Sequence, residues 1–129
     1  MVKMRTVLSV GSALLVLLAG NKAMANEQAK LAAKGKALFV VCQACHTTTD
    51  RASIKIGPSL QGIVGRDAGS LTTFSYSTAL SEAAFSWDEA SLDKWLQSPA
   101  TLVPGNIMSF AGLSDEGQRK AIIAYLKTL

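Results

Sequence analysis

The sequence predicts an all-α fold in which several helices are joined by long loops. Apolar residues recur at helical spacing in three stretches, at residues 31–39, 90–96 and 121–126. No segment alternates between apolar and polar residues, as a half-buried strand would. Glycine and proline recur between residues 47 and 69, which is typical of a loop. Residues 26–129, which number 129 − 25 = 104, suit one domain with a small core.

The N-terminus has the three parts of a secretory signal peptide. Lys3 and Arg5 are basic, residues 7–19 are almost all apolar, and Ala23-Met24-Ala25 suits cleavage. The apolar stretch is shorter than the roughly 20 residues that span a bilayer. We therefore predict export to the periplasm, with an uncleaved membrane anchor as the alternative. The predicted division is a signal peptide over residues 1–25 and a folded domain over residues 26–129.

The charge of the chain gives no reason to expect nucleic-acid binding. The formal net charge of the whole chain is +4. Three basic residues belong to the predicted signal peptide, so the net charge of the folded domain is about +1.

The first helix of the domain is predicted to begin at Asn26, which can cap it, with Glu27 in its opening turn. Gly35 falls inside the helical pattern, where a glycine costs about 1 kcal/mol relative to alanine. Its presence suggests that another backbone crosses close by.

Boundary signals also place helices in the second half of the chain. A short helix is predicted over residues 76–83. Trp87 or Asp88 should open the next helix, which should stop at Ser98 because the residue before Pro99 avoids the α region.

The last helix is predicted to be capped by Ser114. Asp115 and Glu116 would then lie at its positive end and Lys127 near its negative end. Its apolar stripe is formed by Ala121, Ile122, Tyr125 and Leu126.

The segment Cys42-Gln43-Ala44-Cys45-His46 carries the chemistry. Two cysteines three residues apart, followed directly by a histidine, form the attachment motif of c-type haem. Residues i and i+3 of a helical turn point the same way, so both thiols can reach one porphyrin, and His46 can then ligate its iron.

Three other interpretations of this motif exist: a structural disulfide, a thioredoxin-like redox pair and a zinc site. The redox pair lacks a strand before Cys42. Zinc would need a fourth ligand, and the chain has no further cysteine or histidine. We therefore favour covalent haem, and expect no metal other than its iron.

The sixth ligand of the iron is expected to be Met108. His46 is the only histidine, and the other methionines lie in the predicted signal peptide. Met108 follows the Pro104-Gly105 turn in a non-helical segment. A lone methionine is otherwise a flexible core filler. A thioether ligand favours ferrous iron and so raises the reduction potential.

These residues resemble the class I cytochromes c, of the mitochondrial type and its soluble bacterial relatives. The resemblance covers residues 27–129 and implies an all-α class I cytochrome c fold, wrapped around one covalent haem c with one edge exposed. The matching stretches are residues 42–46, 57–60, 62–66, 74–76, 87, 104–105, 108–112 and 122–127.

The resemblance implies further roles. Cys42 and Cys45 would form the two thioethers, and His46 and Met108 the axial ligands. The carbonyl of Pro58 would accept a hydrogen bond from the second nitrogen of His46 and raise its donor strength.

The resemblance also places groups around the ring. Arg66, Tyr76 and Trp87 match propionate contacts, and all three carry hydrogen-bond donors. Phe110 should lie beside the exposed haem edge. The terminal helices should cross with Gly35 and Phe39 packed against Ile122 and Tyr125.

The chain departs from the family around the haem edge, where relatives often carry a ring of lysines. Lys36 and Lys55 remain. Other residues occupy the remaining places: Val41, Ser53, Ala100, Thr101, Ile107, Ser114 and Asp115. We therefore expect a weakly charged, more apolar docking face, and methionine ligation that persists to higher pH.

A second departure lies beside Met108. Where mitochondrial relatives hold a tyrosine, an asparagine and a threonine around a buried water, this chain has Trp95, Leu80 and Asn106. We expect that water to be lost or displaced.

The predicted function is single-electron transfer by a soluble, monomeric carrier rather than an enzyme. The donor would be a membrane quinol-oxidising complex or a periplasmic dehydrogenase. The acceptor would be a terminal oxidase, a reductase or a photosynthetic centre. The alternatives are a membrane-anchored form or dedicated subunit of a redox complex, and a haem peroxidase or sensor, which would need an open sixth position.

Overall fold

The computed structural model describes residues 11–49 and 55–129, with side chains from Lys22 onward. Its elements are α1 (Gly11–Leu38), the 3₁₀ helix η1 (Phe39–Ala44), α2 (Thr78–Ser81), α3 (Glu89–Gln97), α4 (Pro99–Leu102) and α5 (Glu116–Leu126). Within those two ranges there is no strand, and Asp67 and Ser86 form an isolated bridge. The predicted all-α fold is confirmed.

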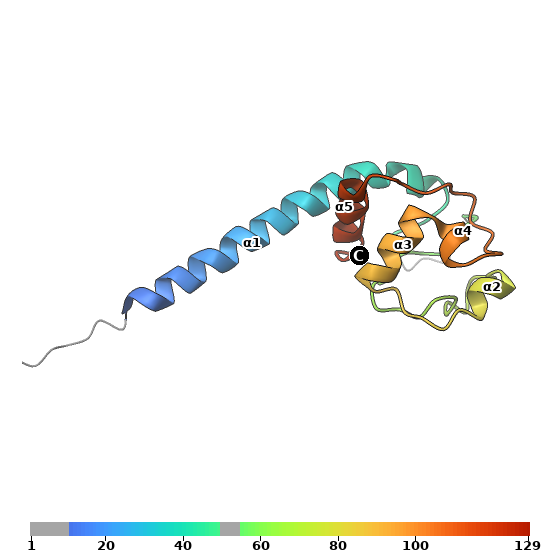
Figure 1. The fold of residues 1–129 in the computed structure, drawn as a ribbon, viewed down its shortest axis with the longest axis horizontal. Helices are drawn as coiled ribbons and strands as arrows, with labels where there is room; N and C mark the ends of the chain where they lie inside the picture. The colour runs from blue at the N-terminus through green and yellow to red at the C-terminus, as the bar shows by residue number, and fades with distance from the viewer. Residues whose placement is uncertain (1–10, 50–54) are drawn as a thin grey trace, which may run out of the picture.

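The crossing of α1 and α5 organises the domain (Figure 1). Gly35 is buried where the helices meet, and a Cβ there would lie 1.8 Å from the carbonyl oxygen of Ala121. Only glycine allows this approach, as the sequence suggested. One turn further along, the rings of Phe39 and Tyr125 pack edge to face with centroids 5.2 Å apart. The predicted contact between the terminal helices is therefore present.

The boundaries of α3 agree with the prediction. The carboxylate of Asp88 accepts a hydrogen bond from the Ser91 N–H at 2.7 Å, and Ser98 ends the helix before Pro99. Leu92, Trp95 and Leu96 form its buried face.

Three predicted boundaries were wrong. Asn26 does not begin a helix, because α1 continues through it from Gly11 without interruption. The cap of α5 is Asp115 rather than Ser114, because it is the Asp115 carboxylate that accepts the Gln118 N–H at 2.7 Å. The helix expected over residues 76–83 forms only as α2 (Thr78–Ser81), capped by Ser77.

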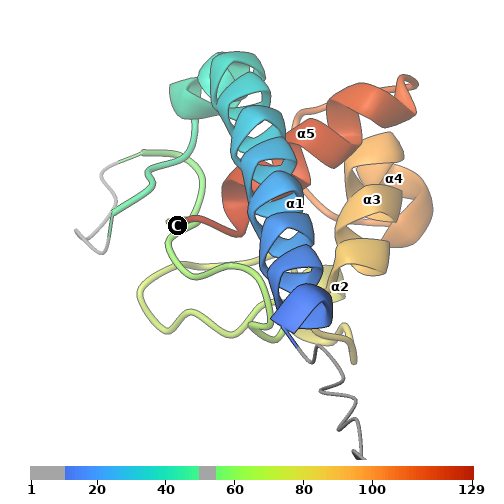
Figure 2. The same ribbon diagram turned by 90° about the vertical axis from the view of Figure 1, so that its left-hand side faces the viewer.

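Residues 11–25 are helical and project from the body as one end of α1 (Figures 1 and 2). Residues 1–10 of the predicted signal peptide lie outside the described residues. Among the described helices, none combines the length and apolar character needed to cross a bilayer.

Candidate functional site

The attachment motif forms a compact turn at the end of η1. The backbone N–H groups of Cys45 and His46 both donate to the carbonyl oxygen of Cys42, at 3.1 and 2.9 Å. In a 3₁₀ helix, residues three apart lie above one another. Cys42 and Cys45 are both half-buried free thiols, and both line the same cavity. Burial raises the pKa of Cys42, with a smaller contribution from Cys45.

That cavity has a volume of about 330 Å³ and is walled mainly by apolar side chains. Its size lies at the lower end of the range typical of small-molecule sites. Helices α3 and α5 contribute one wall through Leu92, Leu96, Ile122 and Leu126. The segments before α2 and after α4 complete it. Such a lining suits a largely apolar ligand.

His46 is held in one orientation on one wall of the cavity. Its imidazole Nδ1 lies 2.8 Å from the carbonyl oxygen of Pro58. A carbonyl can only accept, so Nδ1 carries the proton and Nε2 keeps its lone pair. A Cβ on Gly57 would lie 2.8 Å from Nδ1, so glycine makes room for the ring. The predicted hydrogen bond between His46 and Pro58 is present.

The surroundings of His46 favour its neutral form. Burial lowers the pKa of His46 by more than the hydrogen bond to Pro58 raises it, and the charge of Lys55 lowers it further. Neutral imidazole is the form that ligates metals. Within residues 11–49 and 55–129, no cluster of three or more His, Cys, Asp or Glu side chains is arranged to hold a free metal ion.

Met108 approaches the cavity from the segment between α4 and α5. It is half-buried and lines the same cavity as His46 and both thiols, although it follows His46 by more than sixty residues. Gly112 allows this segment to pass α3. It has φ of +106°, and a Cβ there would lie 2.0 Å from the carbonyl oxygen of Gln97. The backbone at Gly112 can therefore pass close to the end of α3, which a side chain at this position would prevent.

Arg66 and Tyr76 bring polar groups to the otherwise apolar cavity. The Arg66 guanidinium donates to the carbonyl oxygens of Gln61 and Ser59 at 3.0 and 2.9 Å. Burial lowers the pKa of Arg66, with an opposing effect from Tyr76. Burial likewise raises the pKa of Tyr76, and Arg66 opposes that shift. A guanidinium and a phenol both carry hydrogen-bond donors, which are the groups that a half-buried acid group of a ligand would need.

Two tryptophans form the deep aromatic wall. Trp87 packs edge to face against Trp95, with centroids 5.1 Å apart, and against Phe85 at 4.9 Å. Both indoles are buried and line the cavity. Phe110, which follows Met108 by two residues, also lines it.

All the residues selected from the sequence as site candidates converge on this one cavity. They are Cys42, Cys45, His46, Pro58, Arg66, Tyr76, Trp87, Trp95, Met108 and Phe110. Their types suit haem: thiols for attachment, an imidazole and a thioether as ligands, donors for acid groups and apolar walls for the ring.

Sequence reasoning missed two polar features near the site. The Lys55 ammonium donates to the backbone carbonyls of Gln43 and His46, the latter at 3.2 Å, so its charge lies against the attachment turn. The amide of Asn106 binds the backbone on both sides of itself. A lysine or an asparagine in a loop has no periodicity, so no pattern predicted these contacts.

Comparison with known proteins identifies the class. Residues 32–129 match the cytochrome c family. The chain is 44% identical over 91 residues to cytochrome c2 iso-2 of Magnetospirillum molischianum, covering 70% of this chain and 93% of that one. It is 42% identical over 96 residues to cytochrome c of Chlamydomonas reinhardtii, covering 74% and 86% of the two chains.

The structure agrees with the sequence match. The fold resembles cytochrome cH from Methylobacterium extorquens with a TM-score of 0.72 and 41% identity, over 76% of this chain and 98% of that one. The chain belongs to the cytochrome c family. It is a class I c-type cytochrome, an electron carrier whose haem c is bound covalently through Cys42 and Cys45.

Proposed function

We propose that the chain is exported, loses residues 1–25 and works in the periplasm as a soluble, monomeric carrier of single electrons. It is not an enzyme in this proposal. The observation that carries it is that His46 and Met108, from segments far apart in sequence, line the same cavity as the two attachment thiols. An iron bound there could take both His46 and Met108 as protein ligands, and would then have no free position for a substrate.

The bound haem supplies an iron that gains or loses one electron. The chain holds its ligands in place. Pro58 fixes the tautomer and direction of His46 through the 2.8 Å hydrogen bond. The Met108 thioether favours the ferrous state. Arg66, Tyr76 and Trp87 provide donors for the propionates, while Trp95 and Phe110 help to keep water from the ring.

The side chains at the mouth of the cavity support the proposal that the docking face is weakly charged. Three aliphatic side chains there, from three different segments, are largely exposed: Val41 at 64%, Ile56 at 82% and Ile107 at 74%. The Lys55 ammonium is directed onto backbone carbonyls. Of the other positions where relatives hold lysine, Ser53 lies outside the described residues.

The partners in this proposal are larger redox proteins that dock at the mouth of the cavity. The donor is a quinol-oxidising complex or a periplasmic dehydrogenase. The acceptor is a terminal oxidase, a reductase or a photosynthetic centre. A membrane-anchored form or a dedicated subunit of such a complex would instead retain residues 1–25 or co-purify with membranes.

Carbon monoxide binding to the reduced protein tests the closed sixth position. We expect the parent protein not to bind carbon monoxide at neutral pH, and Met108→Ala to bind it readily. Binding by the parent would support a peroxidase or sensor instead.

The mass of the purified periplasmic protein tests whether residues 1–25 are removed. We expect a chain that begins at Asn26, and a full-length membrane-bound chain would contradict the proposal.

A further inference from the structure

Met108 lies on an irregular segment between α4 and α5. The segment begins at Val103, the C-terminal cap of α4, and turns at Gly105, where φ is +88°. It returns to the body at Leu113, whose N–H donates to the carbonyl oxygen of Leu96 at 2.8 Å. Met108 itself lies outside any helix. Its side chain packs against the core, and hydrogen bonds within the segment fix the backbone that carries it.

Asn106 makes those hydrogen bonds on both sides of itself. Its side-chain Nδ2 donates to the carbonyl oxygen of Val103 at 2.8 Å. Its Oδ1 accepts the backbone N–H of Met108 at 3.0 Å. The backbone N–H of Asn106 also donates to Val103, at 3.1 Å. The one amide thus joins the start of the turn to the methionine.

The backbone of Met108 is consequently held at both of its polar groups. Its N–H binds Asn106 at 3.0 Å, and its carbonyl oxygen accepts the N–H of Phe110 at 2.9 Å. A methionine side chain has three rotatable bonds and adapts easily to its surroundings. A thioether on such a side chain stays at one place only if the backbone that carries it is fixed.

We propose that Asn106 is a positioning residue that holds Met108 in place as the sixth ligand. An asparagine is suited to this because its amide both donates and accepts, at a length that spans Val103 to Met108. Serine or threonine would supply one short hydroxyl, and aspartate only acceptors. The inference deepens the proposed function and relies on it, since it takes Met108 to be the ligand.

Displacement of Met108 by added imidazole in the ferric, haem-loaded protein measures how firmly the segment is held. Asn106→Ala removes both side-chain contacts. A lost pair of hydrogen bonds of ordinary strength corresponds to about 5- to 30-fold tighter apparent imidazole binding. Asn106→Asp keeps the acceptor for the Met108 N–H and should fall between Asn106→Ala and the parent.

Ser114→Ala is the matched control. Ser114 lies between α4 and α5, as Met108 does, but it is exposed and outside the cavity lining. Its side chain makes no hydrogen bond within the described residues, so its variant should bind imidazole within about twofold of the parent. The position of the Met108 methyl resonance in the ferrous protein gives a second readout, which should change or broaden in Asn106→Ala. A residue with only a structural role would lower the free energy of unfolding and leave both readouts unchanged.

The outcomes distinguish a failure of the positioning role of Asn106 from a failure of the proposed function. If the parent shows methionine ligation and Asn106→Ala matches it in imidazole affinity and methyl resonance, the positioning role is wrong. If Asn106→Ala does not fold, Asn106→Thr takes its place, because one short hydroxyl cannot make both contacts. Equal behaviour of Asn106→Thr and the parent would then lead to the same conclusion. If the parent itself has no methionine ligand, the proposed function fails first.

Discussion

The backbone of Gly35 touches the carbonyl of Ala121 where the first and last helices of the domain cross. A Cβ at residue 35 would lie 1.8 Å from that oxygen. The Gly35→Ala variant must therefore push α1 and α5 apart and should lose about 3 kcal/mol or more of unfolding free energy. Chemical denaturation of the haem-loaded protein measures this loss.

Gly117→Ala is the matched glycine control, because its added methyl would meet only one side-chain atom, the capping Oδ1 of Asp115 at 3.2 Å, and no backbone atom of another element. Its unfolding free energy should stay within about 1 kcal/mol of the parent. Equal stability of the two alanine variants would show that the helices do not need this close contact.

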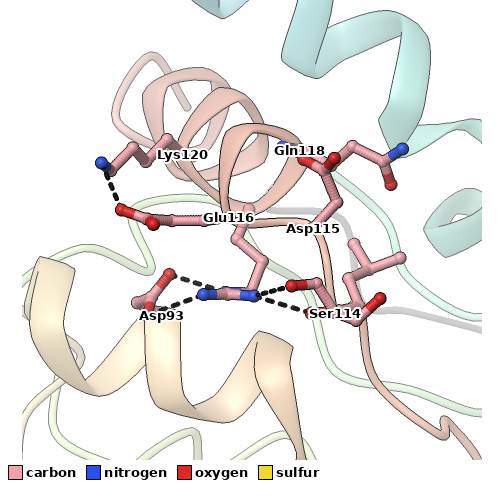
Figure 3. Close-up of polar contacts among 8 residues, drawn as sticks. Asp93, Ser114, Asp115, Glu116, Gln118 and Lys120 are labelled. Carbon is pink, nitrogen blue, oxygen red and sulfur yellow. Dashed lines mark hydrogen bonds and ion pairs between the residues drawn. The ribbon is translucent and has the colours of Figure 1, made fainter.

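Asp93 and Arg119 join α3 to α5 (Figure 3). The buried guanidinium donates to the Asp93 carboxylate at 2.8 Å and to the carbonyl oxygens of Leu113 and Ser114 at 2.9 and 2.8 Å. The carboxylate raises the pKa of Arg119. Asp93→Asn leaves this buried cation without its counter-ion and should cost about 2–3 kcal/mol in an unfolding measurement.

Lys120→Gln breaks the exposed pair with Glu116 and provides the comparison for Asp93→Asn. Both members of that pair are well over half exposed, so its loss should cost less than about 0.5 kcal/mol. A loss of similar size in both variants would mean that the buried guanidinium is not stabilised by Asp93.

Asp88 should make part of the stability depend on pH. The Ser91 N–H lowers the pKa of Asp88 below its ordinary value of 3.8, with help from the Ser91 hydroxyl. The charged cap therefore stabilises the fold fully above the unfolded pKa, and this contribution is lost as the pH falls through the lower folded pKa. Asp88→Asn keeps an uncharged cap.

Unfolding measured at steps from pH 6 to about pH 2 compares the two proteins. The parent should lose more stability than Asp88→Asn on acidification. Parallel curves over this range would contradict a charged cap on α3.

Ile107 bears on the persistence of methionine ligation at high pH. It neighbours Met108 and is 74% exposed, and an aliphatic side chain cannot replace a thioether on iron. Ile107→Lys supplies an amine in that place, so its methionine ligation should be lost at a lower pH than in the parent. The red absorption band of methionine-ligated ferric haem reports this. Loss of the band in the parent at only mildly alkaline pH would disprove the expectation.

A lysine introduced at Val41 tests whether the docking face of the parent protein is weakly charged. Reduction of the ferric protein by a small anionic iron complex should change by less than about tenfold between low and moderate salt. Val41→Lys should react faster at low salt and depend more strongly on ionic strength. Ala90→Lys, on exposed α3 surface outside the cavity lining, is the control and should resemble the parent. A tenfold or greater fall in the parent would indicate a charged face.

Local signals explain which parts of the fold could be predicted. Asp88 and Pro99 marked the two ends of α3, because a capping residue and a proline each act within one turn. Gly35 marked a helix crossing, because only glycine tolerates so close a backbone contact. Asn26 did not begin α1, since nothing around it breaks a helix. At the start of α5, Ser114 and Asp115 are both good caps, and only geometry selects between them. The four-residue α4 was missed because one turn leaves no periodic pattern.

The site was more predictable than the contacts that support it. Haem attachment depends on the spacing of Cys42, Cys45 and His46, which is visible in the sequence. The Asp93–Arg119 pair joins residues 26 positions apart, and charge alone does not reveal which partner a lysine or arginine will find. The hydrogen bonds of Asn106 depend on the loop conformation, which no propensity specifies.

The crossing of α1 and α5 also closes the cavity with residues from both ends of the domain. Phe39 and Cys42 reach it just after α1, whereas Ile122 and Leu126 reach it from α5. The pocket around the pigment is therefore complete only when the two ends of the chain have come together, so its enclosure is a property of the whole fold and not of the attachment turn alone.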